Sequence, residues 1–264
     1  MKVNDILNCI TEIAPLDWQE SYDNAGLQVG DENAEARKAL VALDVTEELV
    51  DEAIAKGCDL IVSHHPLIFR GLKQLTPHSS IGRAVMKAVK HDISIISMHT
   101  NLDNSYLGVN AQLAERLGLK DLRILQPSTP DPLLRGSGMI GEFFEALSEE
   151  DFLRRVAEVI GSPCLRHSAF TGRSVKRVAM CGGSGAFLLP DACSQHADAF
   201  LTADVKYHDF FSPEGELLLV DGGHFETEQF TKELLCGLIR KKFPTFAAEI
   251  AETNTNSVHY FVKI

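Results

Sequence analysis

Histidines and carboxylates gather where predicted strands end. Four strand ends carry one pair each: His64 with His65, His99 with Asp103, Asp204 with His208, and His224 with Glu228. In open parallel α/β sheets, ligands bind beyond the carboxyl ends of the strands. Imidazole and carboxylate groups together suit Zn, Fe, Mn or Co better than Ca or Mg. The pattern therefore predicts a transition-metal centre.

The adjacent pair His64-His65 indicates more than one ion. Neighbouring side chains at an irregular strand end point apart, so the two rings can serve two metals that share a bridging carboxylate. A histidine that stands alone is more often hydrogen-bonded within the fold. We expect that ordinary role for the histidines outside the strand-end pairs, which are His78, His91, His167, His196 and His259.

A glycine-rich run lies between a predicted strand and a predicted helix: Gly182, Gly183, Ser184 and Gly185. Its N–H groups could receive an anion, or the glycines could simply form a tight turn, and the sequence leaves both readings open. The run is not a Walker motif, because no Lys-Ser/Thr follows it. Lys206, between Asp204 and His208, is in the same way either a partner for an anion or a solvated lysine.

The order of elements predicts an α/β fold that is built twice. Strand patterns alternate with helical patterns in both halves, at 39–43, 59–63 and 93–97 and again at 178–181, 199–202 and 217–220. This alternation predicts two mostly parallel sheets with helices on their faces. Because His99-x3-Asp103 and His224-x3-Glu228 each follow a strand, we infer an internal duplication. We expect domains at 1–130 and 131–264, with terminal strands able to cross between them.

Composition excludes several classes of protein. The 264 residues are 45% hydrophobic and 23% charged, which is typical of a globular chain. A net charge of −12 makes broad binding to nucleic acid or to an anionic membrane surface improbable. No apolar run is long enough to span a bilayer. Met1 leads into a helical pattern without a signal peptide, and the six cysteines form no CxxC pair, so we expect a cytoplasmic protein with reduced thiols.

Several motifs together make the chain resemble a known family. They are Ser63-His64-His65-Pro66, the run from His99 to Asp103, Gly223-His224-x3-Glu228, the run from Leu201 to His208, and the segment 18–30 with its Asp23-Asn24-x-Gly26 core. With these motifs the chain resembles the Nif-three-like family, whose bacterial members are catalogued as type 2 homologues of GTP cyclohydrolase I. The resemblance covers essentially the whole chain. Ala203 departs from it, because relatives often have Gly there, and we expect little effect on the site.

The resemblance implies a fold, a metal centre and an assembly. The fold is a pair of similar α/β domains, and the assembly is a ring-shaped homohexamer. Two divalent ions per subunit would be held by five ligands, His64, His65, Asp103, His224 and Glu228, with Glu228 as the bridge. His99 is not counted among the ligands. Its place opposite His224 in the duplication suggests a supporting or substrate-facing role.

The resemblance also implies a reaction, the hydrolytic opening of the guanine imidazole ring of GTP with release of formate. In this hypothesis a metal-activated water attacks guanine C8, and His99 or His208 moves the proton near pH 7. Lys206 and the glycine run would meet the triphosphate, and an acidic chain would need its metals to bind that anion. Two alternatives remain, a metal-dependent hydrolase of another substrate such as a phosphoester and a non-catalytic metal-binding scaffold or regulator.

Overall fold

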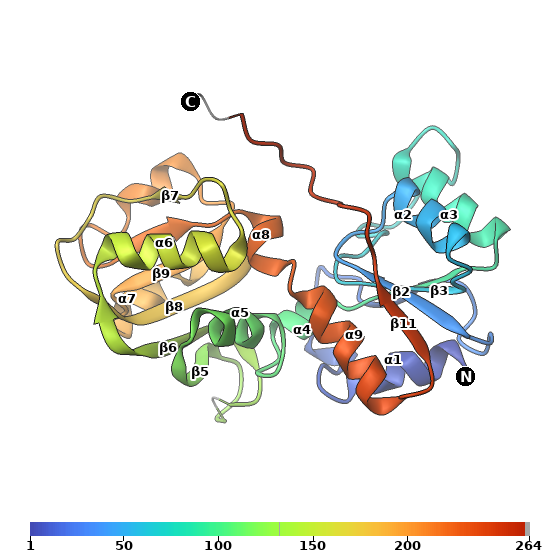
Figure 1. Ribbon diagram of the computed structural model, residues 1–264, viewed down its shortest axis with the longest axis horizontal. Helices are drawn as coiled ribbons and strands as arrows, with labels where there is room; N and C mark the ends of the chain where they lie inside the picture. Colours follow the sequence, from blue (N-terminus) through green and yellow to red (C-terminus); the bar gives the residue numbers. More distant parts are fainter. Residues whose placement is uncertain (132, 262–264) are drawn as a thin grey trace. The chain divides into compact units, whose positions relative to one another are not determined.

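Two compact units make up the chain in the computed structural model, which describes residues 1–131 and 133–261 (Figure 1). Unit 1 comprises Met1–Leu102 and Thr231–Ser257, and unit 2 comprises Asp103–Phe230 and residues 258–261. Each unit has one β-sheet with helices packed against it. This architecture confirms the predicted α/β class.

Unit 1 contains a five-stranded sheet in the order β1-β4-β3-β2-β11. The strands are β1 (Gly26–Val29), β2 (Lys38–Ala42), β3 (Leu60–Ser63), β4 (Ser94–Ser97) and β11 (Ala247–Ile250). The four strands from β4 to β11 are parallel, and β1 is antiparallel to β4 at one edge. Strands β2, β3 and β4 are almost wholly buried, which is why they are continuous apolar runs and not alternating ones. The mostly parallel sheet predicted for this half is confirmed.

Helices cover both faces of the unit 1 sheet (Figure 1). They are α2 (Glu47–Ala55) and α3 (Ser80–Lys90) on one face, and α1 (Val3–Thr11) and α9 (Thr231–Lys242) on the other. Leu49 of α2 and Val85 of α3 belong to one buried cluster with Leu40 and Ile61 of the sheet. The loop before α2 ends at Thr46, whose hydroxyl accepts the Leu49 N–H at 3.2 Å and so caps the helix.

Unit 2 contains a six-stranded sheet in the order β5-β6-β8-β9-β10-β7. The strands are β5 (Lys120–Pro127), β6 (Gly136–Leu147), β7 (Arg166–His167), β8 (Val175–Ser184), β9 (Ala199–Ala203) and β10 (Leu218–Asp221). Only the central β8-β9-β10 pairings are parallel, and the other three are antiparallel. The expectation of a mostly parallel sheet is therefore wrong for this half. Strands β5 and β6 are joined by a short connection, which permits antiparallel pairing but not a parallel crossover.

Helices cover both faces of this sheet too. They are α5 (Val109–Leu117) and α6 (Glu149–Ile160) against one buried cluster, and α7 (Leu189–Ser194) with the 3₁₀ helix η2 (Ala186–Leu188) against the other. Two further short helices begin at the third residue after an interior strand ends, α4 (Thr100–Asp103) after β4 and α8 (His224–Glu228) after β10. In the described part of the chain, none of the helices is long and apolar enough to cross a membrane.

The two halves of the sequence repeat one another in backbone detail. Asp59, before β3, accepts the backbone N–H groups of Arg37 and Lys38 at 2.9 and 3.1 Å. Asp198, before β9, does the same for Lys176 and Arg177 at 2.9 and 2.8 Å. These contacts tie the starts of β2 and β3, and of β8 and β9, in the same way. They support the inferred internal duplication.

Each predicted half gives a strand to the sheet of the other half. Strand β5, within 1–130, pairs with β6 of unit 2, and β11, within 131–264, pairs with β2 of unit 1. The compact units therefore differ from the expected ranges 1–130 and 131–264. The main division lies at Leu102/Asp103, and the segment Thr231–Ser257 belongs to unit 1, because β11 completes the free edge of β2.

Candidate metal centre

Three histidine rings meet at the carboxyl end of the unit 1 sheet. His64 and His65 follow β3, and His99 follows β4 at its second residue. Because β3 and β4 are parallel neighbours, their carboxyl ends lie at the same edge of the sheet. One ring nitrogen from each residue lies within 4.8 Å of those of the other two, so the cluster could hold a metal ion. The ring centroids of His64 and His65 are 4.8 Å apart.

Each of these rings is held through Nδ1. His64 Nδ1 is 2.8 Å from the carbonyl oxygen of Met98, His65 Nδ1 is 2.7 Å from Asp44 Oδ1, and His99 Nδ1 is 2.8 Å from Asp23 Oδ1. A carbonyl oxygen and an ionised carboxylate only accept, so Nδ1 carries the proton and Nε2 carries the lone pair. Metal-binding histidines have this arrangement almost without exception, because the Nδ1 partner fixes both tautomer and ring orientation. The three residues therefore fit a transition metal.

Asp23 is the partner of His99 and is fully buried at its side chain. Burial raises the pKa of this carboxyl, but hydrogen bonds from His99 and Thr100 outweigh it and lower the pKa to about 2. Asp44 shows the same balance: burial raises its pKa, and hydrogen bonds from His65 and Thr255 bring it below its usual value. Both groups therefore accept as carboxylates at neutral pH.

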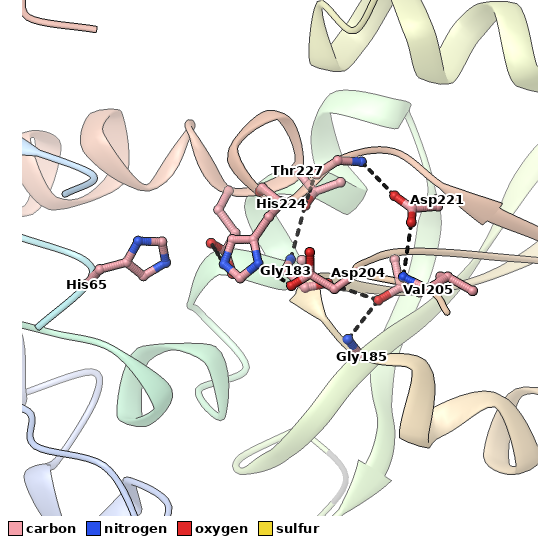
Figure 2. A network of polar contacts seen from close by, with 12 residues as sticks. His65, Gly183, Gly185, Asp204, Val205, Asp221, His224 and Thr227 are labelled. Carbon is pink, nitrogen blue, oxygen red and sulfur yellow. Dashed lines mark hydrogen bonds and ion pairs between the residues drawn. The ribbon is translucent and has the colours of Figure 1, made fainter. Parts of the chain in front are cut away.

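Unit 2 carries a second set of metal-binding groups on α8. His224 and Glu228 are one helical turn apart, with Nε2 of the imidazole 3.0 Å from Oε2 of the carboxylate. His224 Nδ1 lies 2.7 Å from Asp204 Oδ2, as Figure 2 shows. The imidazole is again anchored through Nδ1, and its other nitrogen faces a carboxylate that is itself only 4% exposed. This pair also fits a divalent cation.

One buried carboxylate organises the loops on both sides of the His224–Asp204 pair (Figure 2). Asp221, at the end of β10, accepts the N–H of Gly223 through Oδ1 and the N–H of Val205 through Oδ2, both at 3.0 Å. Gly223 directly precedes His224, and Val205 directly follows Asp204. Asp204 itself has φ +54, a left-handed conformation that a non-glycine residue keeps only when its surroundings fix it.

Asp103, the last residue of α4, lies in unit 2 with Glu228. Burial raises the pKa of the Cys181 thiol, and the carboxylates of Asp103 and Glu228 raise it further. Both acids therefore act on one small region at the end of β8.

The glycine run at the end of β8 has its N–H groups engaged. Gly182 donates to Asn110 Oδ1 at 2.9 Å, Gly183 to Thr227 Oγ1 at 3.0 Å, and Gly185 to Thr202 Oγ1 at 2.9 Å. These contacts leave the three glycine N–H groups engaged within the fold, which speaks against an anion cradle; the run ends β8, and only Gly185 lies in the turn before η2. Ser184 is the last residue of β8 and is exposed at its side chain.

The remaining predicted residues lie on an exposed segment after Asp204. Lys206 is exposed, and His208 lies in the 3₁₀ helix η3 (Tyr207–Phe211). The His208 ring packs against two aromatic rings, with centroid distances of 5.2 Å to Tyr207 and 6.4 Å to Phe211. Of the two histidines expected to transfer protons, His99 is the one whose ring belongs to the three-histidine cluster.

Comparison with known proteins identifies the family of this chain. The family model described as Duf34/NIF3 (NGG1p interacting factor 3) matches residues 1–257. The chain belongs to this family. A GTP cyclohydrolase 1 type 2 homolog from Clostridium perfringens is 36% identical over 230 residues, covering 86% of this chain and 87% of the relative.

Solved structures share the fold of this chain. A Staphylococcus aureus hypothetical protein aligns over 99% of both chains, with 32% identity and a TM-score of 0.91. A Bacillus cereus protein related to NIF3 aligns over 99% of both chains, with a TM-score of 0.92 at 24% identity. The last likeness concerns the fold alone.

Sequence reasoning missed the residues that hold the histidines. Asp44 directly follows the strand pattern at 39–43, so its position at a strand end was a usable signal. Asp23 was visible only as part of the N-terminal family motif. No local signal marked Asp221, which reads as the polar end of a buried strand.

Proposed function

We propose that the chain binds two divalent metal ions and uses them for hydrolysis. The ligands would be the five residues expected from the family: His64, His65, Asp103, His224 and Glu228, with Glu228 shared by the two ions. One observation carries the proposal. In each unit the candidate histidines have Nδ1 committed to a carboxylate or a carbonyl, the arrangement that metal-binding imidazoles require.

The donor set favours a transition metal, because nitrogen and carboxylate oxygen occur together without a thiolate. When bound, such ions lower the pKa of coordinated water towards neutrality and so supply hydroxide to an electrophilic centre. The chain's own part is to hold the ligands rigidly and to move protons. His99 is the residue we assign to proton transfer, since Asp23 fixes its Nδ1 and so orients the ring.

The substrate we propose first is GTP. The reaction would add one water at guanine C8, which opens the imidazole ring to a formamide, and a second water would hydrolyse that formamide and release C8 as formate. The support is the name of relatives such as the Clostridium perfringens protein. The net charge of −12 adds a requirement, because a nucleotide triphosphate should bind only when the cations offset that charge.

The decisive experiment measures metal and chemistry together. The wild type, His64→Ala and Glu228→Ala proteins are purified without added metal, and their metal content is determined. Two exposed residues give matched controls, His91→Ala and Glu150→Ala. We expect the wild type and the controls to retain metal, and both site variants to lose most of it. Equal metal content in all five proteins would refute the ligand assignment.

Assays of turnover then distinguish GTP from a phosphoester as the substrate. Metal-loaded wild type is incubated with GTP, and formate is measured; a chromogenic phosphoester is tested in parallel. Formate release that the two site variants abolish supports the cyclohydrolase proposal. Cleavage of the phosphoester alone would replace GTP by that class of substrate, and inactivity in both assays would favour a metal-binding scaffold. The homohexameric ring stays a prediction, which light scattering of the purified protein checks.

A further inference from the structure

The chain continues past its last strand and returns to the histidine cluster of unit 1. We define the C-terminal segment as residues 251–257, the irregular stretch that follows β11 (Figure 1). Its first residue extends the β11–β2 pairing, with Ala251 N–H donating to Val41 O at 2.8 Å. Four residues later the hydroxyl of Thr255 donates to Asp44 Oδ2 at 2.7 Å. The segment thus reaches the carboxylate that holds His65.

The C-terminal segment is fastened to α2 before it reaches Asp44. Glu52 accepts the backbone N–H groups of Glu252 and Thr253, both at 2.8 Å, and the Thr253 hydroxyl at 2.5 Å. Lys56 adds ion pairs to Glu52 at 2.8 Å and to Glu252 at 2.9 Å. Three hydrogen bonds to one carboxylate fix the backbone here, so Thr255 approaches Asp44 from a fixed position.

Asp44 divides its two oxygens between the segment and the metal-binding histidine. Oδ2 accepts from Thr255, and Oδ1 lies 2.7 Å from His65 Nδ1. A carboxylate with one partner can rotate about its Cβ–Cγ bond, and a donor on the second oxygen opposes that rotation. The side chain of Asp44 is 34% exposed, so the surrounding packing alone does not hold it.

We propose that Thr255 is a positioning residue for the metal centre: its hydroxyl orients Asp44, and Asp44 in turn orients His65 so that Nε2 faces the metal. The inference rests on the metal binding proposed above and extends it to the C-terminal segment. Partners of metal-binding histidines contribute about 10- to 100-fold to metal affinity, and a residue one step further out should contribute towards the lower end of that range.

Three substitutions test this role in the full-length protein. Thr255→Val keeps the shape and removes the hydroxyl, and Thr255→Ser restores a hydroxyl. The matched control is Thr253→Val, in the same segment, which removes a hydrogen bond to Glu52 and leaves the contact with Asp44 in place. Affinity for Zn²⁺ is measured by competition with a chromogenic chelator, and the Co²⁺-loaded proteins are compared by visible absorption.

We expect Thr255→Val to bind Zn²⁺ about 10-fold more weakly and to change the Co²⁺ spectrum, with Thr255→Ser and Thr253→Val close to the wild type. Wild-type affinity in Thr255→Val would overturn the inference while leaving the metal centre intact. Equal losses in Thr255→Val and Thr253→Val would also overturn it, because the segment would then act only through its attachment. A wild type that binds neither ion would instead refute the proposed function, and this inference with it.

Discussion

Gly183 lies so close to Glu228 that any side chain at position 183 would have to displace the Glu228 carboxylate. A β-carbon built on the glycine would stand 2.9 Å from the carboxyl carbon of Glu228 and closer still to Oε1. The backbone of β8 is therefore one wall of the space that the proposed bridging carboxylate occupies. Gly183 also has φ +60, a left-handed conformation that favours glycine.

Gly183→Ala should consequently displace Glu228 and weaken metal binding. The added methyl group would push the Glu228 carboxylate away from its place beside His224 Nε2. Because both groups are proposed metal ligands, we expect a loss of about 10-fold or more in metal affinity. Titration with Zn²⁺ against a chelator measures it.

Gly161→Ala is the control for backbone strain. Gly161 has φ +66, but a β-carbon there would meet nothing within 4 Å. Alanine at this position should lower the free energy of unfolding by about 1 kcal/mol and leave metal affinity unchanged. Equal metal affinity in the two variants would show that Glu228 accommodates the methyl group or does not bind metal.

The positions of the histidines could be predicted from sequence because strand ends are local signals. A buried apolar run followed by His64-His65 identifies a strand and its end, and parallel neighbours bring such ends together. The partners that orient the rings are different. Asp44 and Thr255 are 211 residues apart in the chain, and Asp23 and His99 are 76 apart, so no periodicity links them.

The internal duplication is visible in the sequence, but the exact correspondence of its residues is not. His99-x3-Asp103 and His224-x3-Glu228 look equivalent, but β4 ends at Ser97 and β10 at Asp221 in matching registers. His99 is thus the second residue after its strand and His224 the third. The two motifs are therefore offset by one residue relative to their strands, and only the pairing register reveals it.

Asp221→Asn should weaken metal binding through the backbone. The carboxylate of Asp221 accepts from Val205 and Gly223, and an amide can accept on only one side. The loops next to Asp204 and His224 would then lose one anchor, so we expect about a 10-fold loss of metal affinity.

Asp198→Ala provides the control for lost stability. Asp198 also accepts two backbone N–H groups, both on Oδ2, but before β9, at the opposite end of the strand from Asp204. Both variants should lose about 1–3 kcal/mol of unfolding free energy in urea titrations, and only Asp221→Asn should lose metal affinity. A parallel loss of metal affinity in Asp198→Ala would mean that general destabilisation explains both.

The stabilising contribution of Glu52 should be lost in acid. Burial raises the pKa of this carboxyl, but hydrogen bonds from Lys56, Thr253 and the backbone outweigh it and lower the pKa to about 2, from 4.5 when unfolded. The unfolded chain therefore takes up the proton first as the pH falls. The contribution of Glu52 is complete above about pH 4.5 and is lost between there and about pH 2.

Urea unfolding of wild type and Glu52→Gln, both metal-free with chelator present, measures this effect. We expect the wild type to be the more stable at pH 7, and the difference to shrink steadily below pH 4.5. A difference that does not change between pH 7 and pH 3 would contradict the lowered pKa.

Metal loading should stabilise the native protein, because the proposed ligands come together only in the folded chain. A ligand at 100 times its Kd adds about 2.7 kcal/mol to the free energy of unfolding, so the midpoint of thermal unfolding should rise when Zn²⁺ is added to chelator-treated protein. Glu228→Ala should lose most of that rise, whereas Glu150→Ala, changed on the exposed side of α6, should keep it. Differential scanning calorimetry at several Zn²⁺ concentrations measures both. An equal rise in the two variants would place the stabilising ion away from Glu228 and would remove the support for a shared carboxylate.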